Sequence, residues 1–478
     1  MPATMTLEHS LATWLPAQRW YPGGAAAVDL AIIADTPLAS GDPELRHLIV
    51  SVSEGGDAVW YQVLAGLRAQ VPAELNHAII GPDGRGGTAY DALHDPELTR
   101  VLLRGIAAGR VTGPLRFVAE PGAPIDETAD SLVLSAEQSN TSLIFGESAI
   151  LKVFRRVFPG QNPDLEVAHA LAGLGSSHVA QPFGWIEAIV ADGGVASAGD
   201  SSAGSSAGNG QAGRTGNGAS HAEPALLALL SEYLRGACDG WSLAETSLRD
   251  LYAADTSRAA DAGGDFAGEA HRLGAATASV HADLATAFGT SLVDPDAVAG
   301  LAARMTSKLK AASAEVPDLA RLAGKVEAGY ARLAGLGTRL QVQRVHGDYH
   351  LGQVMRTQTG WVALDFEGEP AAPLARRRSR SPALQDVAGM LRSFDYAARH
   401  QLAGHPDAAR LAASARDWVT RNSAAFCAGY AETSGTDPRA QDVLLRALML
   451  DKAVYEVTYE ARHRPSWQAI PLDAIAEM

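Results

Sequence analysis

The sequence has little cysteine and no long apolar run. Its two cysteines, Cys238 and Cys427, cannot build a disulfide framework or a four-ligand zinc site, so a reducing compartment is expected. No apolar run reaches the roughly 18 residues of a membrane span, and the first twenty residues lack the basic and apolar segments of a signal peptide. These absences predict a cytoplasmic protein that does not bind to or cross a membrane.

Positive charge is scarce as well. The 39 lysines and arginines face 54 aspartates and glutamates, which leaves a net charge of −15. Such a field repels nucleic acid and anionic membrane surfaces, so neither is expected as a partner. The length of 478 residues and the 47% of hydrophobic residues are typical of a globular protein with two or three domains. Nothing in the sequence indicates an oligomeric state.

The hydrophobic patterns divide the chain into three parts. Residues 1–112 begin with a helical pattern, continue with strand-like runs and predict a small α+β domain. Residues 113–235 read as short strands, interrupted by a Gly/Ser-rich segment at about 192–221 that is typical of a disordered loop. Residues 236–478 are dominated by Ala-rich amphipathic helices. The expected fold class is therefore α+β and bilobal, and nucleotides commonly bind between such lobes.

The most specific motif is His-Gly-Asp-Tyr-His-Leu-Gly-Gln at 346–353, followed by Leu-Asp-Phe-Glu at 364–367. In protein kinases an aspartate takes the proton of the acceptor hydroxyl, an amide five residues later binds magnesium, and a second aspartate holds the metal ions on the phosphates. Asp348, Gln353 and Asp365 occur in that order, with Gln in place of Asn. The alternative is a pair of aspartates that only cap turns.

A lysine that binds the nucleotide phosphates is then expected on a strand of the preceding part, paired with a helical glutamate. Lys152 is the only lysine in the first 300 residues and lies in the apolar run AILKVF. Glu166, at the start of a predicted helix, is the expected partner, although Asp164 fits nearly as well. Alternatively, Lys152 extends from a strand edge into solvent.

Two further segments are candidates for the nucleotide site. Polar residues between two predicted strands could cradle phosphates through backbone amides and short side chains: Ser139, Asn140, Thr141 and Ser142. A second segment, where the β-rich part meets the helical part, could hydrogen-bond an adenine edge or be a plain connecting strand: Glu232, Tyr233 and Leu234.

Several segments together resemble the maltokinase-like sugar kinases of actinobacteria, which have the aminoglycoside-phosphotransferase and protein-kinase-like fold. The resemblance is carried by EQSNTS…ILKVFRR, LRGACDGW, HGDYHLGQV, WVALDFEGEP, SPALQDVAGMLRSFDYAA and YEARHRPSW. It implies an N-terminal cap domain, a β-rich subdomain that carries Lys152, and a helical lobe in which Asp348 is the base. It also implies ATP and Mg²⁺ as cofactors, with Gln353 and Asp365 on the metal and Glu367 as a candidate for a second ion.

The acceptor is expected to bind to the helical lobe, beside His350 of the catalytic motif. Aromatic rings stack on sugar faces and carboxylates bind hydroxyls or an ammonium, which suggests Asp395, Tyr396, Trp418, Glu456, Tyr459 and Glu460. Glu456 and Glu460 are four residues apart and share one helical face. The alternative is a solvated acidic face with aromatic residues in the core.

The acidic cluster favours an amino sugar, with glucosamine converted to glucosamine 6-phosphate. The alternatives are a maltokinase that makes maltose 1-phosphate, an aminoglycoside phosphotransferase, and a pseudokinase without activity. Asp386 is expected to support the catalytic loop. The basic run of Arg376, Arg377, Arg378 and Arg380 could contact phosphates or lie in a solvated loop.

Overall fold

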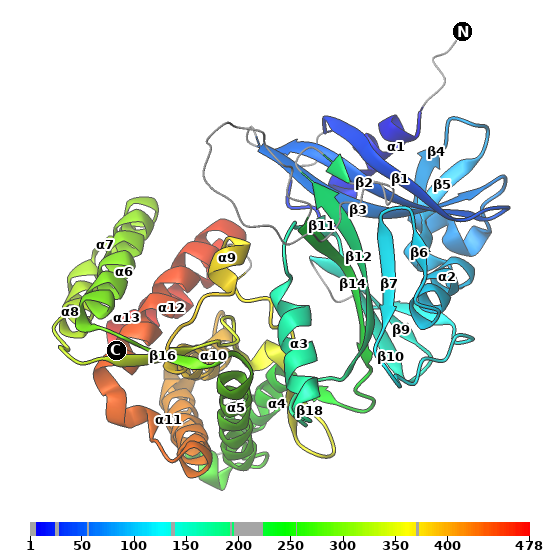
Figure 1. Ribbon diagram of the computed structural model, residues 1–478. Coiled ribbons are helices and arrows are strands. Elements are labelled where there is room, and N and C mark those ends of the chain that lie inside the picture. The colour runs from blue at the N-terminus through cyan, green and yellow to red at the C-terminus, as the bar shows by residue number, and fades with distance from the viewer. Residues whose placement is uncertain are drawn as a thin grey trace, which may run out of the picture. The chain divides into compact units, whose positions relative to one another are not determined.

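A computed structural model of the chain describes residues 6–23, 28–54, 57–134, 139–191, 194–195, 223–254, 256–369 and 372–478. Its helices and strands, labelled in Figure 1, form two compact units. The first unit is Met1–Glu166 with Gln181–Arg235, and the second is Val167–Ala180 with Gly236–Met478. The mixture of helix and sheet confirms the α+β prediction. Most of the segment predicted to be a disordered loop, 192–221, lies outside the described residues.

The first sheet of the first unit is antiparallel and follows the predicted strand-like runs. Its strands, in spatial order, are β1 (Leu30–Ala39), β2 (Glu44–Glu54), β3 (Asp57–Arg68), β5 (Thr88–Asp91) and β4 (Ile79–Pro82), with β11 (Arg156–Val157) also paired to β3. Helix α1 (Leu7–Trp14) covers it, and the Thr6 hydroxyl caps the helix by accepting from His9 N at 3.3 Å. Leu11, Leu48 and Val63 are among the apolar residues that this packing buries.

The second sheet of the first unit carries Lys152. Its strands, in spatial order, are β6 (Val111–Thr112), β7 (Leu115–Ala119), β12 (Pro182–Ala191), β14 (Glu223–Glu232), β10 (Ala149–Phe154), β9 (Asn140–Phe145) and β8 (Ser131–Leu134), and β13 (Gly194–Val195) pairs with β12. Helix α2 (Pro96–Ala107) packs on β7 and contributes Leu102 and Ile106 to the core. Because β10 has partners on both sides, Lys152 is held on a central strand.

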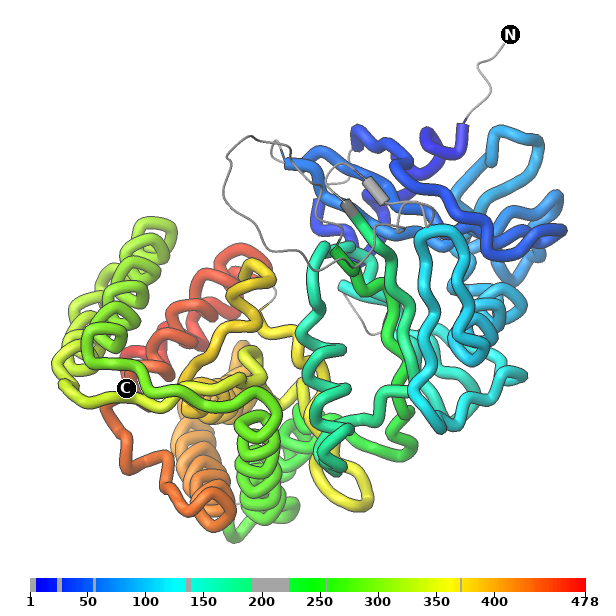
Figure 2. The backbone as a smooth tube through the Cα atoms, in the orientation of Figure 1, coloured from blue at the N-terminus to red at the C-terminus, as the bar shows by residue number. Residues whose placement is uncertain are grey.

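The second unit is mainly helical. Its helices are α4 (Gly240–Ala253), α5 (Ala267–Phe288), α6 (Pro295–Glu315), α7 (Pro317–Ala320), α8 (Ala323–Ala334), α9 (Leu374–Arg377), α10 (Leu384–His400), α11 (Ala408–Ser434), α12 (Asp442–His463) and α13 (Ala469–Glu477), and α3 (Pro163–Gly173) enters it from the first unit. Figures 1 and 2 show α5 and α11 side by side. A Cβ at Gly274 or Gly429 would collide with the backbone of the opposite helix, so both glycines are required for this close approach.

Small sheets interrupt the helices and carry the kinase-like motif. One pairs β16 (Thr290–Val293) with β17 (Leu340–Gln343), and the other has the order β15 (Cys238–Asp239), β18 (Val354–Arg356), β19 (Trp361–Ala363). The segment 346–353 lies between β17 and β18 and ends in a short 3₁₀ turn, Leu351–Gln353. The motif is thus fixed at both ends by strands of the second unit.

Candidate active site

The β18–β19 hairpin brings the two halves of the motif together. Val354 pairs with Ala363, so Gln353 directly precedes the hairpin and Asp365 is the second residue after it. Leu364 N donates to Gln353 O at 2.9 Å, and the Gln353 amide donates from Nε2 to Asp365 Oδ2 at 3.1 Å. The twelve residues from Gln353 to Asp365 in the sequence therefore correspond to one short hairpin.

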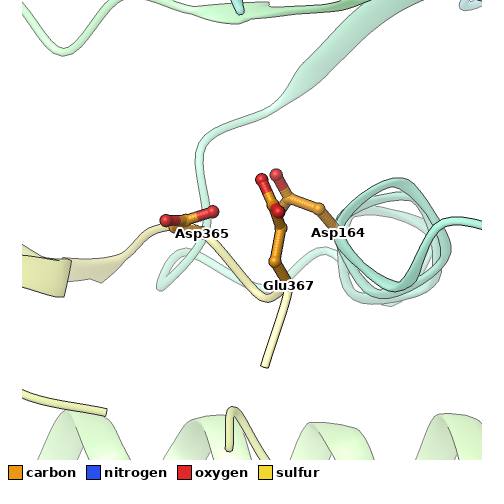
Figure 3. A group of neighbouring side chains, drawn as sticks. All are labelled: Asp164, Asp365 and Glu367. Atoms are coloured by element: carbon orange, nitrogen blue, oxygen red, sulfur yellow. The ribbon is translucent and has the colours of Figure 1, made fainter. Parts of the chain in front are cut away.

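The acidic residues after the hairpin have a geometry that suits a divalent cation. Figure 3 shows Asp365 and Glu367 on the loop after β19, and it also labels Asp164 at the start of α3. Carboxylate oxygens of Asp365 and Glu367 lie within 4.8 Å of each other. Asp365 has a φ of 62°, a left-handed conformation that is uncommon for a residue with a side chain and is typical of constrained sites. Two carboxylates and one amide are the oxygen donors that Mg²⁺ prefers.

Asp386 on α10 holds the start of the catalytic loop. Its carboxylate accepts from His346 N at 2.7 Å and from Gly347 N at 2.9 Å, and it pairs with His281 Nε2 at 3.1 Å. Burial acts to raise the pKa of Asp386, but the hydrogen bond and charge of His281 outweigh it, and the pKa is lowered. Gly347 has a φ of +87°, which allows the chain to turn before Asp348. The predicted support of the loop by Asp386 is confirmed.

Asp348 is paired with a lysine that sequence reasoning missed. Lys452 on α12 donates from Nζ to Asp348 Oδ1 at 2.8 Å, and His350 Nε2 lies 4.0 Å from Asp348 Oδ2. Burial acts to raise the pKa of Asp348, yet the charge of Lys452 outweighs it and leaves the pKa below its usual value. Burial lowers the pKa of His350 to about 4, which keeps this ring neutral at pH 7. Asp348 is therefore ionised and able to accept a proton.

Lys152 has an acidic partner at the start of α3. Its Nζ donates to Asp164 Oδ2 at 3.3 Å, and the side chains are 18% and 8% exposed. The ion pair excludes the alternative in which Lys152 extends freely into solvent. Asp164 was the second choice from the sequence; Glu166, half-buried in the same helical turn, stays a prediction.

The two other candidate nucleotide segments, 139–142 and 232–234, are partly hydrogen-bonded within the first unit. Ser139 is exposed and Asn140 begins β9, whereas Ser142 is buried opposite Lys152 in the strand register. Thr141 is also buried, and its hydroxyl accepts from Arg155 Nε at 2.8 Å. The Thr141 hydroxyl is therefore already paired with a buried arginine of the first unit, and its contact with phosphate stays a prediction.

Similarly, Glu232 N donates to Gln181 O at 2.8 Å and Tyr233 N to Ser148 O at 2.9 Å. These two amides are not available to an adenine edge in this conformation. The prediction that this segment binds an adenine edge therefore rests on its carbonyl oxygens and on the N–H of Leu234.

The acidic cluster predicted for the acceptor is neutralised by arginines. Arg392 Nη2 donates to Glu456 Oε2 at 2.5 Å, and Arg464 Nη2 donates to Glu460 Oε1 at 2.8 Å. Glu460 also accepts from Tyr396 Oη at 2.8 Å and is only 2% exposed. The prediction that these two glutamates present a free acidic face to an ammonium is wrong. Arg464 pairs with Glu460 from four residues further along the chain, and α10 supplies Arg392, which the periodicity of α12 does not reveal.

Two other predicted acceptor residues are engaged in contacts of their own. Trp418 is 1% exposed, lies against Phe266 with ring centroids 5.8 Å apart, and donates to Ser247. It is a core residue, so its assignment to the acceptor wall is wrong. The Asp395 carboxylate is paired with Arg392 and Arg399 and lines a cavity of about 730 Å³ between α10, α11 and α13. Tyr459, with 36% of its surface exposed, lies between the rings of Tyr455 and His463 and stays a prediction.

A different cavity opens beside the catalytic loop. It has a volume of about 400 Å³ and lies within the second unit, lined by Gly347 and Tyr349 of the loop and by Lys452 and Tyr455 of α12. Glu369, two residues beyond Glu367, is also in its wall. No feature of the sequence indicated Lys452, which lies 104 residues from Asp348, or Glu369, whose position at the cavity depends on the path of the loop.

Comparisons with known proteins show what the chain is similar to. Residues 14–95 match the family model of the maltokinase N-terminal cap domain. The chain is 29% identical over 400 residues to a glucosamine kinase of Streptacidiphilus jiangxiensis, covering 81% of this chain and 82% of that protein. This chain is similar to glucosamine kinases. A glucosamine kinase of Mycolicibacterium smegmatis (strain ATCC 700084 / mc(2)155) is 28% identical over 351 residues, 71% of this chain and 77% of that protein.

Solved structures extend the similarity to almost the whole chain. A glucosamine kinase in complex with glucosamine, ADP and inorganic phosphate has a TM-score of 0.64 and 26% identity, over 98% of both chains. A second crystal form of a glucosamine kinase has a TM-score of 0.65 with the same identity and coverage. The chain therefore has the fold of these relatives and begins with a maltokinase-type cap domain. Among the helices of the described residues, none combines the length and apolarity of a membrane span.

Proposed function

We propose that this protein is an ATP-dependent sugar kinase that converts glucosamine and ATP to glucosamine 6-phosphate and ADP. The observation that carries the proposal is the match to a glucosamine kinase, solved with glucosamine, ADP and inorganic phosphate, over 98% of both chains. The relatives found by sequence bear the same name and are at least 28% identical. The kinase-like order of Asp348, Gln353 and Asp365 supports the same reaction class.

Asp348 is the proposed base. Its ionised carboxylate accepts the proton of the sugar hydroxyl as the oxygen attacks the γ-phosphorus and the bond to the ADP oxygen breaks. The ammonium of Lys452, at 2.8 Å, orients the carboxylate and keeps it ionised. Asp386 contributes by fixing the backbone of the loop on which Asp348 lies.

Gln353, Asp365 and Glu367 are the proposed ligands of Mg²⁺. When bound, the ion neutralises charge that develops on the transferred phosphoryl group. The amide of Gln353 presently donates to Asp365; a half-turn of the amide would present its oxygen to an ion held by Asp365. Lys152 is the proposed ligand of the nucleotide phosphates, assisted by Ser139 and Asn140, and Asp164 is its ion-pair partner.

The cavity beside the catalytic loop is the proposed acceptor site. It adjoins Gly347 and Tyr349, the residues on either side of the base. Two carboxylates line it: Asp451, which pairs with Lys308 at 3.0 Å, and Glu369, for which no ion pair is found among the described residues. We therefore assign to Glu369 the recognition of the sugar ammonium, in place of Glu456 and Glu460.

A panel of four sugars in a coupled ADP-release assay tests the proposal: glucosamine, glucose, N-acetylglucosamine and maltose. A charge-assisted hydrogen bond to the ammonium is worth about 1.5–3 kcal/mol, so kcat/KM for glucosamine should exceed that for glucose by roughly tenfold to a hundredfold. N-acetylglucosamine should be poor, because acetylation removes the charge. Efficient turnover of maltose with negligible turnover of glucosamine would identify a maltokinase and refute the proposal.

The variant Glu369→Gln tests the assignment of the ammonium. It should shrink the preference for glucosamine over glucose while changing kcat/KM for glucose little. The matched control is Glu327→Gln on the exposed face of α8, which should leave the preference unchanged. An unchanged preference in Glu369→Gln would remove Glu369 from acceptor recognition.

A further inference from the structure

The cavity beside the catalytic loop, which Glu369 lines, also has a strongly basic wall. Arg304 and Lys308, one helical turn apart on α6, line it together with Arg376 of α9 and Arg380. Arg304, Lys308 and Arg376 also line an adjoining hollow of about 330 Å³, so these cations lie around one space. The function proposed above needs a hydroxyl-binding pocket and does not account for this concentration of guanidinium groups.

The charges of this wall are only partly compensated. Lys308 pairs with Asp451 at 3.0 Å. In the part of the chain that the structure describes, Arg304, Arg376 and Arg380 have no carboxylate within ion-pair distance; Arg380 donates to a carbonyl, that of Phe288, at 2.7 Å. The chain has 54 acidic residues against 39 basic ones, so partners are abundant elsewhere. Like charges around one cavity repel each other, and a bound anion would relieve that repulsion.

We propose that Arg304, Arg376 and Arg380 form a subsite for a phosphate group in this cavity. The guanidinium fork matches the oxygens of a phosphate in size and direction, and it remains charged at any physiological pH. A phosphate dianion bound here would share the cavity with Glu369. The resulting pattern, one carboxylate and several guanidiniums in one cavity, is complementary to a ligand with both an ammonium and a phosphate.

An amino-sugar phosphate has both groups. This identification rests on the proposed function, whose product is glucosamine 6-phosphate, whereas the phosphate subsite rests on the arginines alone. Retention of the product at this subsite would make the enzyme sensitive to its own product at the acceptor cavity. Inorganic phosphate carries the same recognised group without the sugar and is the second possible source.

Isothermal titration calorimetry on the nucleotide-free full chain tests the subsite with two probes, glucosamine 6-phosphate and inorganic phosphate. The test variant is Arg304→Ala with Arg376→Ala; both side chains belong to exposed residues, so the fold should be kept, and thermal unfolding checks this. The matched control, Arg321→Ala with Arg416→Ala, removes the same charge from exposed residues outside this cavity. Loss of the two charge-assisted contacts should weaken binding about tenfold or more, and the control should bind like the wild type.

The two probes separate the sources of the phosphate. Binding of both probes, each weakened in the test variant, shows that the phosphate group alone is recognised. Binding of the sugar phosphate only, weakened in the same variant, shows that the sugar contributes as well. Equal affinity of wild type and test variant, or no binding of either probe to the wild type, overturns the inference. Because no ATP is present, a failure of glucosamine turnover leaves this result unaffected, so the two proposals can fail separately.

Discussion

At the scale of single residues, the charge around Asp348 determines what the site can do. A buried carboxylate without a partner would be protonated more readily and would be a poor base. Lys452 opposes that effect from 2.8 Å, and the neighbouring His350 is neutral because burial lowers its pKa to about 4. The base is thus kept ionised by a residue from a distant helix.

Replacement of Asp348 by asparagine should remove turnover while leaving nucleotide affinity nearly unchanged. The side chain keeps its size but cannot accept the proton of the hydroxyl, and the loss of a positioned base costs roughly 10²-fold or more in rate. Steady-state kinetics and titration with ATP and Mg²⁺ measure the two effects. A rate close to that of the wild type would show that Asp348 is not the base.

Replacement of Lys452 by methionine should raise the pKa of Asp348, because burial then acts without the opposing ammonium. Since only the ionised carboxylate is active, the acid limb of the kcat/KM profile should move to higher pH. The control is Lys310→Met on the exposed side of α6, which should leave the profile in place. An unmoved acid limb with a uniformly lower rate would indicate that Lys452 does not act through the ionisation of Asp348.

At the scale of elements, one glutamine joins the two sheets of the first unit. Gln62 on β3 donates from Nε2 to Phe154 O at 2.5 Å and to Leu227 O at 2.6 Å, which belong to the other sheet. Its Oε1 is 3.0 Å from the buried His47 Nε2. All these groups are buried, so the amide satisfies atoms that water cannot reach.

Gln62→Leu should therefore destabilise the protein. Each buried acceptor left without a donor costs about 1–3 kcal/mol, and the substitution leaves two carbonyls and one histidine without this partner. Denaturation in urea, followed by fluorescence, measures the change. The exposed Gln70→Leu is the control and should change the free energy of unfolding by no more than about 0.5 kcal/mol. Equal stability of both variants would show that the connection is not needed.

At the scale of the whole molecule, a long segment of the chain connects β12 to β14 in the second sheet. These strands pair directly, with Val190 opposite Glu223, so the ends of the intervening segment are neighbours in the sheet. The composition of that segment, rich in glycine, alanine and serine, offers little apolar surface for a core.

Deletion of residues 193–220 with a short Gly-Ser turn in their place should leave folding and kinetics close to those of the wild type. The register of β12 and β14 already brings the ends together, and each doubling of loop length changes the closure free energy by only about 0.6 kcal/mol. Thermal unfolding and glucosamine kinetics provide the check. A folded deletion variant with severely reduced activity would assign a functional role to the segment.

Local sequence alone determined much of this protein. The apolar runs around Val50 and Lys152 predicted strands, and the motif His346–Gln353 with Asp365 shows the residue order of the kinase reaction, with a spacing that fits one hairpin. Such features depend on neighbours a few residues away, whose spacing is visible in the chain. The acceptor side was decided only by the tertiary structure. The pattern of α12 predicted a free acidic face at Glu456 and Glu460, but Arg392 of α10 pairs with Glu456, and Trp418 proved to be a core residue. Lys452 reaches Asp348 from 104 residues away. Pairing between side chains of different helices depends on how those helices pack, and the period of a single helix carries no information about which charge its neighbour supplies.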